Sequence, residues 1–261
     1  MDEIRVVEAG LVPYALAYGW QQQLHRRRVS HEIPDVALLM EHPHVYTLGR
    51  RFAGEHLLVG EALLAARGIE VHQADRGGSI TYHGPGQLVG YPIIDLREIP
   101  ALGPPERPDV IRYLRVLEEA LIESVRFFGV TAARREGLTG VWVGASKLAA
   151  IGVNVSRGVS KHGFALNVSA DLSYFDGMVP CGIQEAKPTS LERVLGQGPA
   201  MAEVARKVAV TLAAILDRKL ATCSLSEVGL SAADEALPDA KLPDEARMGG
   251  LPGVLGCGEV G

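Results

Sequence analysis

The sequence is poor in cysteine and in aromatic residues, and neither sign of charge dominates it. Three cysteines occur among 261 residues, without a CxxC pair, so nothing indicates a disulfide framework, a structural zinc or a dithiol redox site. With 26 basic and 31 acidic side chains the formal charge is −5, which gives no general attraction for nucleic acid or anionic lipid. No apolar run approaches the length of a membrane span, and residues 1–5 do not begin a signal peptide. We therefore expect a cytoplasmic protein that binds neither nucleic acid nor membrane.

The composition is otherwise that of a globular protein. Hydrophobic residues make up 47% of the chain and charged residues 22%, which excludes a disordered or fibrous protein as a description of the whole. The length suits one large domain or two small ones.

Hydrophobic spacing predicts three helices, over residues 13–28, 110–128 and 201–220, with Asp109 capping the second helix and Gly129 closing it. Short apolar runs bounded by Gly or Pro predict strands at residues 36–40, 45–48, 79–82, 88–94, 141–143, 148–155 and 163–168. Strands in the middle, with helices before, between and after them, indicate an α+β or mixed α/β fold.

The C-terminal segment differs from the rest. Residues 221–261 hold seven acidic residues, two basic residues and no aromatic residue. Such a segment buries too little apolar surface to offset its ordering entropy. We predict one domain over residues 1–220 followed by a mobile tail, in which Cys223 and Cys257 are bystanders.

Residues 76–87 are unusually rich in glycine. Four glycines let the backbone pass close to a ligand and offer open N–H donors, while Arg76 and His83 provide groups that bind or polarise one. The same composition is also typical of a tight turn between two strands, and both interpretations stand. The glycine spacing does not match the dinucleotide-binding fingerprint.

Two further stretches carry a lysine and a cysteine in unusual surroundings. Lys147 lies among small and apolar residues after a turn, where a tunable pKa suits a base or an activator of a thiolate, although a solvated turn lysine is the simpler interpretation. Cys181 lies between Pro180 and Gly182, which suits an exposed nucleophile, although a free cysteine is often a small core residue.

His42 and His44 flank a proline and are the only hint of a metal site. No second cluster has the spacing of metal ligands, so we predict no metal and interpret the pair as exposed.

Taken in order, these stretches resemble the lipoyl(octanoyl) transferases of lipoate biosynthesis. The resemblance rests on RGGSITYHGPGQLVGYPIIDL at 76–96, GVWVGASKLAAIGV at 140–153 and HGFALNVSADLSYFDGMVPCGI at 162–183. A weaker match, EHPHVYTLGR at 41–50, extends it over most of residues 1–220. The tail has no counterpart.

The resemblance implies the fold of the biotin and lipoate protein ligases, a mixed sheet flanked by helices. It implies transfer of an octanoyl group from acyl carrier protein to a lysine of a lipoyl domain, through an acyl-enzyme on cysteine. The acceptors would be the lipoyl domains of 2-oxoacid dehydrogenases and the glycine cleavage H protein. Thioester exchange followed by amide formation needs no cofactor.

The resemblance also assigns the site. Cys181 would be the nucleophile and Lys147 its partner, with Lys147 or His83 as the base of the second half-reaction. The expected substrate pocket comprises Arg76, Gly77, Gly78, Ser79, Ile80, Thr81, Tyr82, His83, Ala150, Ile151, Gly152, Gly163, Phe164 and Ala165. Gly152 and Gly163 would leave backbone room for the acyl chain.

Two other functions compete with this one. An ATP-dependent lipoate or biotin protein ligase on the same fold needs no nucleophilic cysteine, so the presence of Cys181 favours the transferase over the ligase. A non-catalytic protein that binds acylated partners is the other. For an acidic carrier the chain offers basic clusters at Arg26, Arg27, Arg28, Arg50, Arg51, Arg134 and Arg135, each of which is equally well explained as a solvated segment.

Overall fold

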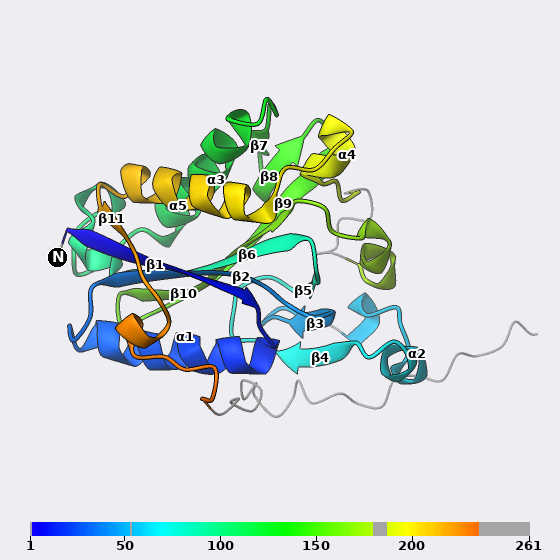
Figure 1. Cartoon of the computed structure of the whole chain (residues 1–261), viewed down its shortest axis with the longest axis horizontal. Helices are drawn as coiled ribbons and strands as arrows, with labels where there is room; N and C mark the ends of the chain where they lie inside the picture. Colours follow the sequence, from blue (N-terminus) through cyan, green and yellow to red (C-terminus); the bar gives the residue numbers. More distant parts are fainter. Residues whose placement is uncertain (1, 53, 180–186, 235–261) are drawn as a thin grey trace, which may run out of the picture.

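The computed structural model describes residues 2–52, 54–179 and 187–234, which form a mixed α/β fold with a large and a small sheet (Figure 1). The strands are β1 (Glu3–Leu11), β2 (Asp35–Glu41), β3 (Val45–Leu48), β4 (Glu70–Gln73), β5 (Ile80–His83), β6 (Gln87–Ile93), β7 (Ala133–Arg135), β8 (Leu138–Val143), β9 (Ser146–Ser156), β10 (Val159–Asn167) and β11 (Lys219–Thr222). The helices are α1 (Tyr14–Val29), α2 (Glu61–Ala66), α3 (Val110–Arg126), α4 (Leu191–Leu195) and α5 (Met201–Ile215). This confirms the predicted fold class.

The large sheet is covered by helices on both faces. Its strand order is β11-β1-β2-β6-β10-β9-β8-β7, and only the pairs made by β1 with β11 and with β2 are parallel. Helices α3 and α5 pack on one face and α1 on the other, so the sheet separates two hydrophobic cores (Figure 1).

Helix α3 forms for the reasons that its sequence gives. The carboxylate of Asp109 accepts hydrogen bonds from two N–H groups of the first turn, at 2.9 and 3.0 Å. Leu117 and Leu121 are fully buried on the face turned to the sheet. Gly129 has a φ of +82°, which closes the turn after the helix.

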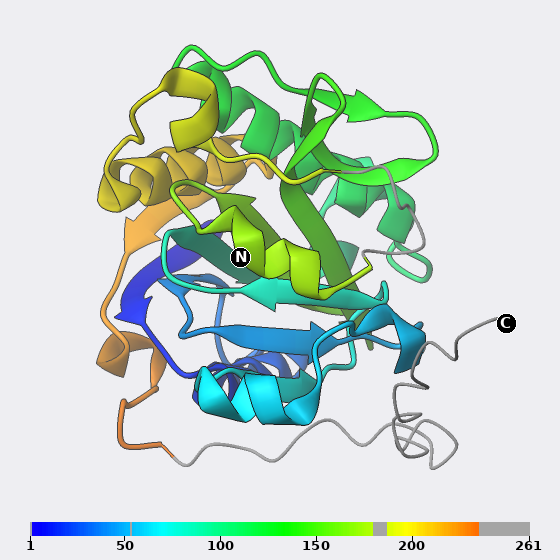
Figure 2. The same ribbon diagram turned by 90° about the vertical axis from the view of Figure 1, so that its right-hand side faces the viewer.

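The small sheet, in the order β4-β3-β5, lies beside the 3₁₀ helix Leu172–Gly177 (Figure 2). The chain passes from the small sheet to the large one in the three residues between β5 and β6. Gly86 has a φ of +82°, and a Cβ there would lie 2.7 Å from the backbone of Ser169. Glycine is therefore required at this crossing, which brings His83 and Gln87 together at the junction of the sheets.

Three element predictions need correction. Strand β10 begins at Val159 rather than at residue 163, because Arg157 and Gly158 form a tight turn with positive φ that continues the hairpin from β9. Helix α5 ends at Ile215 rather than at residue 220, and β11 follows it. Strands β1, β4, β7 and β11 and the short helices α2 and α4 were not predicted.

The expected tail is also corrected in part. Residues 221–234 pack on the domain: β11 pairs with β1, and Val228 and Leu230 are buried against the core beneath α1. The indole N–H of Trp20 donates to the carbonyl oxygen of Ser231 at 3.1 Å. Residues 235–261, with Cys257, lie outside the described residues.

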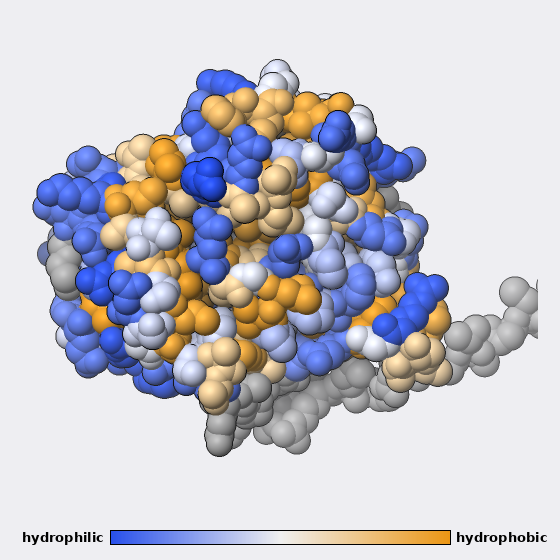
Figure 3. All heavy atoms as spheres, in the orientation of Figure 1, coloured by the Kyte–Doolittle hydropathy of each residue, from blue (hydrophilic) through white to orange (hydrophobic). Residues whose placement is uncertain are grey.

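On the face shown in Figure 3, hydrophobic side chains form small groups between hydrophilic ones. Within the described ranges, every helix is too short or too polar to cross a bilayer.

Candidate active site

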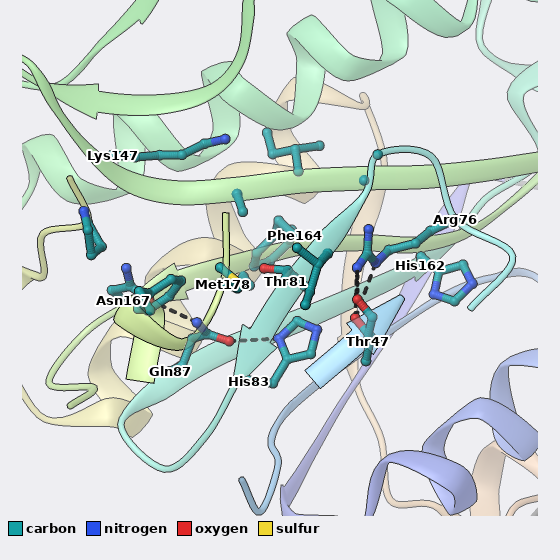
Figure 4. Close-up of a pocket in the computed structure, with 18 of the residues that line it drawn as sticks. Thr47, Arg76, Thr81, His83, Gln87, Lys147, His162, Phe164, Asn167 and Met178 are labelled. Atoms are coloured by element: carbon teal, nitrogen blue, oxygen red, sulfur yellow. Dashed lines mark hydrogen bonds between the residues drawn. The ribbon is translucent and has the colours of Figure 1, made fainter. Parts of the chain in front are cut away.

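A cavity of about 330 Å³ opens where the small sheet meets β6, β9 and β10 of the large one (Figure 4). Its walls come from all three stretches that the sequence singled out. Of the predicted site residues, Arg76, Gly77, Gly78, Ile80, Thr81, His83, Lys147, Ala150, Ile151, Gly152, Gly163, Phe164 and Ala165 line it. The volume is near the lower end of the range of about 300–1,000 Å³ for small-molecule pockets.

The glycine-rich loop comprises residues 76–79, lies before β5 in the cavity wall and is held in place by the side chain of Arg76. Nη2 of Arg76 donates to the side chain of Thr47 at 2.9 Å and also to the Thr47 carbonyl oxygen. The N–H of Gly77 donates to the Val153 carbonyl oxygen of β9 at 2.9 Å. Gly49 must lack a Cβ, because one would lie 2.7 Å from Nη1 of Arg76. The loop is thus a fixed wall between the two sheets.

Ser79 and Tyr82 do not line the cavity, contrary to the prediction. The hydroxyl of Ser79 lies 2.7 Å from Nδ1 of His56. Tyr82 is completely buried and stacks on Tyr174, and its hydroxyl lies 2.7 Å from Nδ1 of His44. Within β5, Thr81 and His83 line the cavity and Tyr82 between them faces the other side, as alternation requires. Ile80, at the start of the strand, also reaches the cavity.

His83 lies at the cavity wall with 6% of its surface exposed. Its Nδ1 is 2.7 Å from Oε1 of Gln87, and Nε2 of Gln87 donates to Oδ1 of Asn167 at 2.9 Å (Figure 4). Burial, then the neighbouring His42, lower the pKa of His83 well below its usual value, so the ring is neutral at pH 7.

Lys147 enters the cavity from β9, about half-buried. Its Nζ is 5.3 Å from the centre of the Trp142 ring, within range of a cation–π contact. Gly140, with a φ of +130°, makes room for it, because a Cβ there would lie 2.7 Å from Cε of Lys147. The backbone of Lys147 bonds to Lys187 and Thr189, which ties the segment after residue 186 to β9.

Cys181 lies outside the described residues. On either side of residues 180–186, Met178 and Lys187 both line the cavity.

The glycines of β9 and β10 do not leave room for an acyl chain as predicted. Gly152 pairs with Gly163, but a Cβ on Gly163 would lie 2.3 Å from the carbonyl oxygen of Gly90 on β6. A Cβ on Gly152 would lie 3.0 Å from the carbonyl oxygen of Gly77. Neighbouring backbone occupies the place of a Cβ at both glycines. The two glycines line the cavity with their backbone, beside the side chains of the residues next to them in β9 and β10.

The sequence prediction missed several lining residues: Tyr14, Thr47, Gln87, Tyr91, His162, Asn167, Phe175, Asp176, Met178, Lys187 and Pro188. His162 has a φ of +56°, and its Nε2 lies 2.6 Å from Oδ1 of Asp75. Lys161 also binds Asp75, at 2.6 Å. These partners hold the pKa of Asp75 well below its usual range, although burial opposes them. The available signal was polarity, because His162 and Asn167 stand at the two ends of the apolar run 163–166.

The interpretation of His42 as exposed is wrong. The residue is fully buried, with Nδ1 2.6 Å from the Val12 carbonyl oxygen and Nε2 2.7 Å from the Tyr91 hydroxyl. Burial lowers the pKa of His42 to about 4. His44 is partly buried.

One group with metal-ligand geometry occurs in the described part of the chain, His31 with Asp95 and Glu98. Arg28 already provides a cation there, with Nη2 2.7 Å from Glu98 and Nη1 3.6 Å from Asp95. The group is therefore better explained as an ion-pair cluster.

The basic clusters are not equivalent. Arg28 is completely buried and cannot contact a partner, and Arg134 binds Glu118 and Glu119 at 3.0 and 2.6 Å. Arg50 and Arg51 are exposed. Their N–H groups donate to the carbonyl oxygens of Arg76 and Gly78, so this pair adjoins the cavity loop.

Comparison with known proteins gives consistent relatives. Residues 13–213 match the family described as the lipoyl protein ligase A/B catalytic domain. An octanoyltransferase of Chloroflexus aggregans is 48% identical over 220 residues, covering 83% of this chain and 96% of that protein. An octanoyltransferase of Rubrobacter xylanophilus is 50% identical over 201 residues, covering 76% of this chain and 87% of that protein.

Solved structures share the fold at low sequence identity. The structure of a bipartite lipoate protein ligase and its E2 lipoyl domain from Thermoplasma acidophilum has a TM-score of 0.66 at 16% identity and covers 87% of this chain and 89% of that chain. A lipoate-protein ligase A bound with ATP has a TM-score of 0.66 at 14% identity and covers 87% of this chain and 91% of that chain. These likenesses confirm the expected lipoate-ligase fold.

Proposed function

Because this chain belongs to the lipoyl protein ligase A/B catalytic domain family, we propose that it is an octanoyltransferase of protein lipoylation. It transfers an octanoyl group from octanoyl-acyl carrier protein to a lysine of a lipoyl domain, in the cytoplasm. One observation carries the proposal: Lys147, His83 and the Arg76 loop converge on one partly apolar cavity in a chain about half identical to octanoyltransferases.

The proposed chemistry has two half-reactions. The Cys181 thiolate attacks the donor thioester, a new C–S bond forms, and the carrier thiolate leaves. An amine of the lipoyl domain then attacks the acyl-enzyme, a C–N bond forms, the C–S bond breaks so that the Cys181 thiolate leaves, and the amine passes a proton to a base of the site. The first step exchanges one thioester for another and the second forms a more stable amide, so no nucleotide is consumed.

Lys147 is proposed to activate the cysteine. A thiol with a pKa near 8.5 is only a few per cent thiolate at pH 7, whereas a nearby ammonium that lowers the pKa to about 6.5 makes most of it reactive. Support comes from the lysine's place in the cavity wall and from Met178 and Lys187, which flank the cysteine segment and line the same cavity.

The apolar part of the cavity suits the acyl chain. Burying six or seven methylenes at ~0.8 kcal/mol each gives about 5 kcal/mol. Ala150, Ile151, Phe164 and Ala165 supply the apolar wall, so chain selectivity is proposed to arise mainly there.

The proposed acceptors are lipoyl domains, including those of 2-oxoacid dehydrogenases and the glycine cleavage H protein. We propose that the acidic acyl carrier protein docks on Arg50 and Arg51. This exposed pair lies beside the cavity, because its backbone N–H groups hydrogen-bond to the glycine-rich loop. Charge reversal of both should raise KM for the carrier and weaken its dependence on salt. Charge reversal at Arg26, which is exposed on α1, is the matched control. Equal KM values in both variants would remove Arg50 and Arg51 from the docking site.

Intact mass after mixing with octanoyl-acyl carrier protein tests the function as a whole. We expect an adduct of one octanoyl group, absent in Cys181→Ser and discharged by a lipoyl domain. Product formed only from free octanoate with ATP would instead indicate a ligase, a function that the octanoyltransferase relatives do not favour. Full transfer activity in Cys181→Ser would overturn the acyl-enzyme.

A further inference from the structure

A chain of hydrogen bonds runs along the cavity wall and ends at His83 (Figure 4). Nδ2 of Asn167 donates to the Thr189 carbonyl oxygen at 2.9 Å, and Oδ1 of Asn167 accepts from Nε2 of Gln87 at 2.9 Å. Oε1 of Gln87 lies 2.7 Å from Nδ1 of His83. All three side chains are at least 94% buried, so water does not compete for these bonds.

Two backbone carbonyls fix the direction of this chain. A carbonyl oxygen only accepts, so the atom of Asn167 that faces Thr189 is its nitrogen. Nε2 of Gln87 likewise faces the carbonyl oxygen of Tyr82, at 3.2 Å. The oxygen of the Gln87 amide therefore faces His83, and Nδ1 of His83 must carry the proton. In a neutral ring, Nε2 is left with the lone pair.

The surroundings of His83 keep the ring neutral. The ring of His42, which directly follows β2, and the ring of Tyr14, on α1, have their centres 5.7 and 6.4 Å from the centre of the His83 ring. Arg76 and His162 face it from the loop and from β10, and both act against a second positive charge. No carboxylate among the described residues hydrogen-bonds to the ring, and none of these residues hydrogen-bonds to Nε2.

We propose that Gln87 and Asn167 are positioning residues that hold His83 in the Nδ1–H tautomer, so that Nε2 accepts the proton of the attacking lysine amine. The inference rests on the proposed acyl transfer and concerns its second half-reaction alone. A C–N bond forms between the amine and the acyl carbon, the C–S bond breaks, and the thiolate leaves with its electron pair. The amine proton passes to Nε2, and the imidazolium then releases it to solvent.

The test separates the two half-reactions. Rapid mixing with octanoyl-acyl carrier protein measures acylation, and mixing of the purified acyl-enzyme with a lipoyl domain measures transfer. Gln87→Leu removes the acceptor for Nδ1–H, whereas Gln87→Glu keeps an acceptor at the same position. Gln23→Leu, on α1 away from the cavity, is the matched control. ¹⁵N NMR of the imidazole ring reports the tautomer directly.

We expect Gln87→Leu to populate the Nε2–H tautomer and to slow transfer about 100-fold, within the range of about 10²–10⁴ for general base catalysis. Acylation should change less than about threefold, which also shows that the variant folds. At pH 8, Gln87→Glu should keep the Nδ1–H tautomer and most of the transfer rate. Asn167→Ala acts one hydrogen bond further from the His83 ring, so it should also slow transfer, but by less than Gln87→Leu does.

An unchanged tautomer in Gln87→Leu, or an equal loss in both half-reactions, would overturn the positioning role. Should the wild-type protein form no acyl-enzyme at all, the proposed function fails first, and the two failures are therefore distinct.

Discussion

Lys147 shows how one side chain depends on its immediate surroundings. Its ammonium lies over the face of Trp142, and the guanidinium of Arg135 is 4.9 Å from the centre of the same ring. The aromatic face favours the charged form of the lysine. A charged ammonium at the cavity is what a thiolate needs as a partner.

We therefore expect Lys147→Met to raise the pKa of the Cys181 thiol toward about 8.5. The rate of alkylation by iodoacetamide against pH measures this, and the wild-type midpoint should lie clearly below that value. Lys219→Met, an exposed change on β11, is the control. If the midpoint is the same with and without Lys147, the lysine does not activate the thiol.

Arg28 is a second case, in which a residue of a basic run proves to be structural. Its Nε lies 2.9 Å from the buried carboxylate of Asp35, and it also pairs with Asp95 and Glu98. We predict that Arg28→Met lowers the free energy of unfolding by about 3 kcal/mol, because it removes the buried cation that Asp35 and Asp95 share and leaves them with Arg218 and Arg97 alone. Urea unfolding measures this. Arg26→Met, at an exposed position, should change it by less than about 0.5 kcal/mol.

At the scale of elements, the success of prediction followed the strength of local signals. Helix α3 combines a capping aspartate, a long apolar stripe and a closing glycine, and its bounds agree with prediction to within two residues. Strand β1 has charged residues among its apolar ones and is held by its neighbours β2 and β11, so its own sequence does not mark it. The turn at Arg157 and Gly158 was missed because the usual Asn-Gly signal is absent.

The candidate site divides in the same way. The residue types alone pointed to the Arg76 stretch and to Lys147, whereas the resemblance to the lipoyl(octanoyl) transferases supplied the pocket segments 76–83, 150–152 and 163–165, of which all residues but Ser79 and Tyr82 line the cavity. Which face each side chain occupies depends on register, so Tyr82 could not be distinguished from Thr81 in advance. The partnership of Gln87 with Asn167, 80 positions apart, exists only because β6 pairs with β10.

The pairing of β6 with β10 also sets the size of the cavity. Gly90 lies opposite Phe164, and a Cβ on Gly90 would be 2.1 Å from Cζ of the ring. The ring therefore fills the place of a side chain at Gly90 while forming part of the cavity wall. Its removal should enlarge the space open to an acyl chain.

We predict that Phe164→Ala shifts the acyl preference from eight carbons toward ten or twelve, with acylation by the octanoyl carrier slowed about tenfold as apolar contact is lost. Single-turnover acylation with carriers of different chain length measures this, alongside thermal unfolding to check the fold. Gly90→Ala should act in the opposite sense, by pushing the ring into the cavity. A chain-length profile unchanged in both variants would contradict a role for this wall in selectivity.

For the whole molecule, buried histidines make stability depend on pH. The pKa of His42 is lowered to about 4 by burial, from about 6.5 in the unfolded chain, and burial also lowers the pKa of His83 and His162. The unfolded state thus binds protons first as the pH falls. Stability is fully present above about pH 6.5 and is lost on going down toward pH 4.

For His42 alone, we expect a loss of about 2 kcal/mol between pH 7 and pH 5. Urea unfolding followed by tryptophan fluorescence measures it. The dependence should be shallower by that amount in His42→Gln and unchanged in His31→Asn, an exposed position. Parallel pH profiles for wild type and His42→Gln would show that His42 is not the responsible group.

The extent of the folded domain gives the last prediction at this scale. The segment after Leu220 completes β11 beside β1 and buries Val228 and Leu230 against the core that contains Trp20. At about 1.5–3 kcal/mol for each buried side chain, these two residues contribute about 3–6 kcal/mol. A chain ending at residue 234 should therefore unfold at a clearly higher urea concentration than one ending at residue 220. Val228→Ser in the longer chain should lower its urea midpoint part of the way toward that of the shorter chain. The substitution removes the buried apolar side chain and leaves the backbone of the segment in place. Were the two chains to unfold at the same urea concentration, the domain would end at residue 220 in energetic terms, and the contacts with Trp20 would add nothing to its stability.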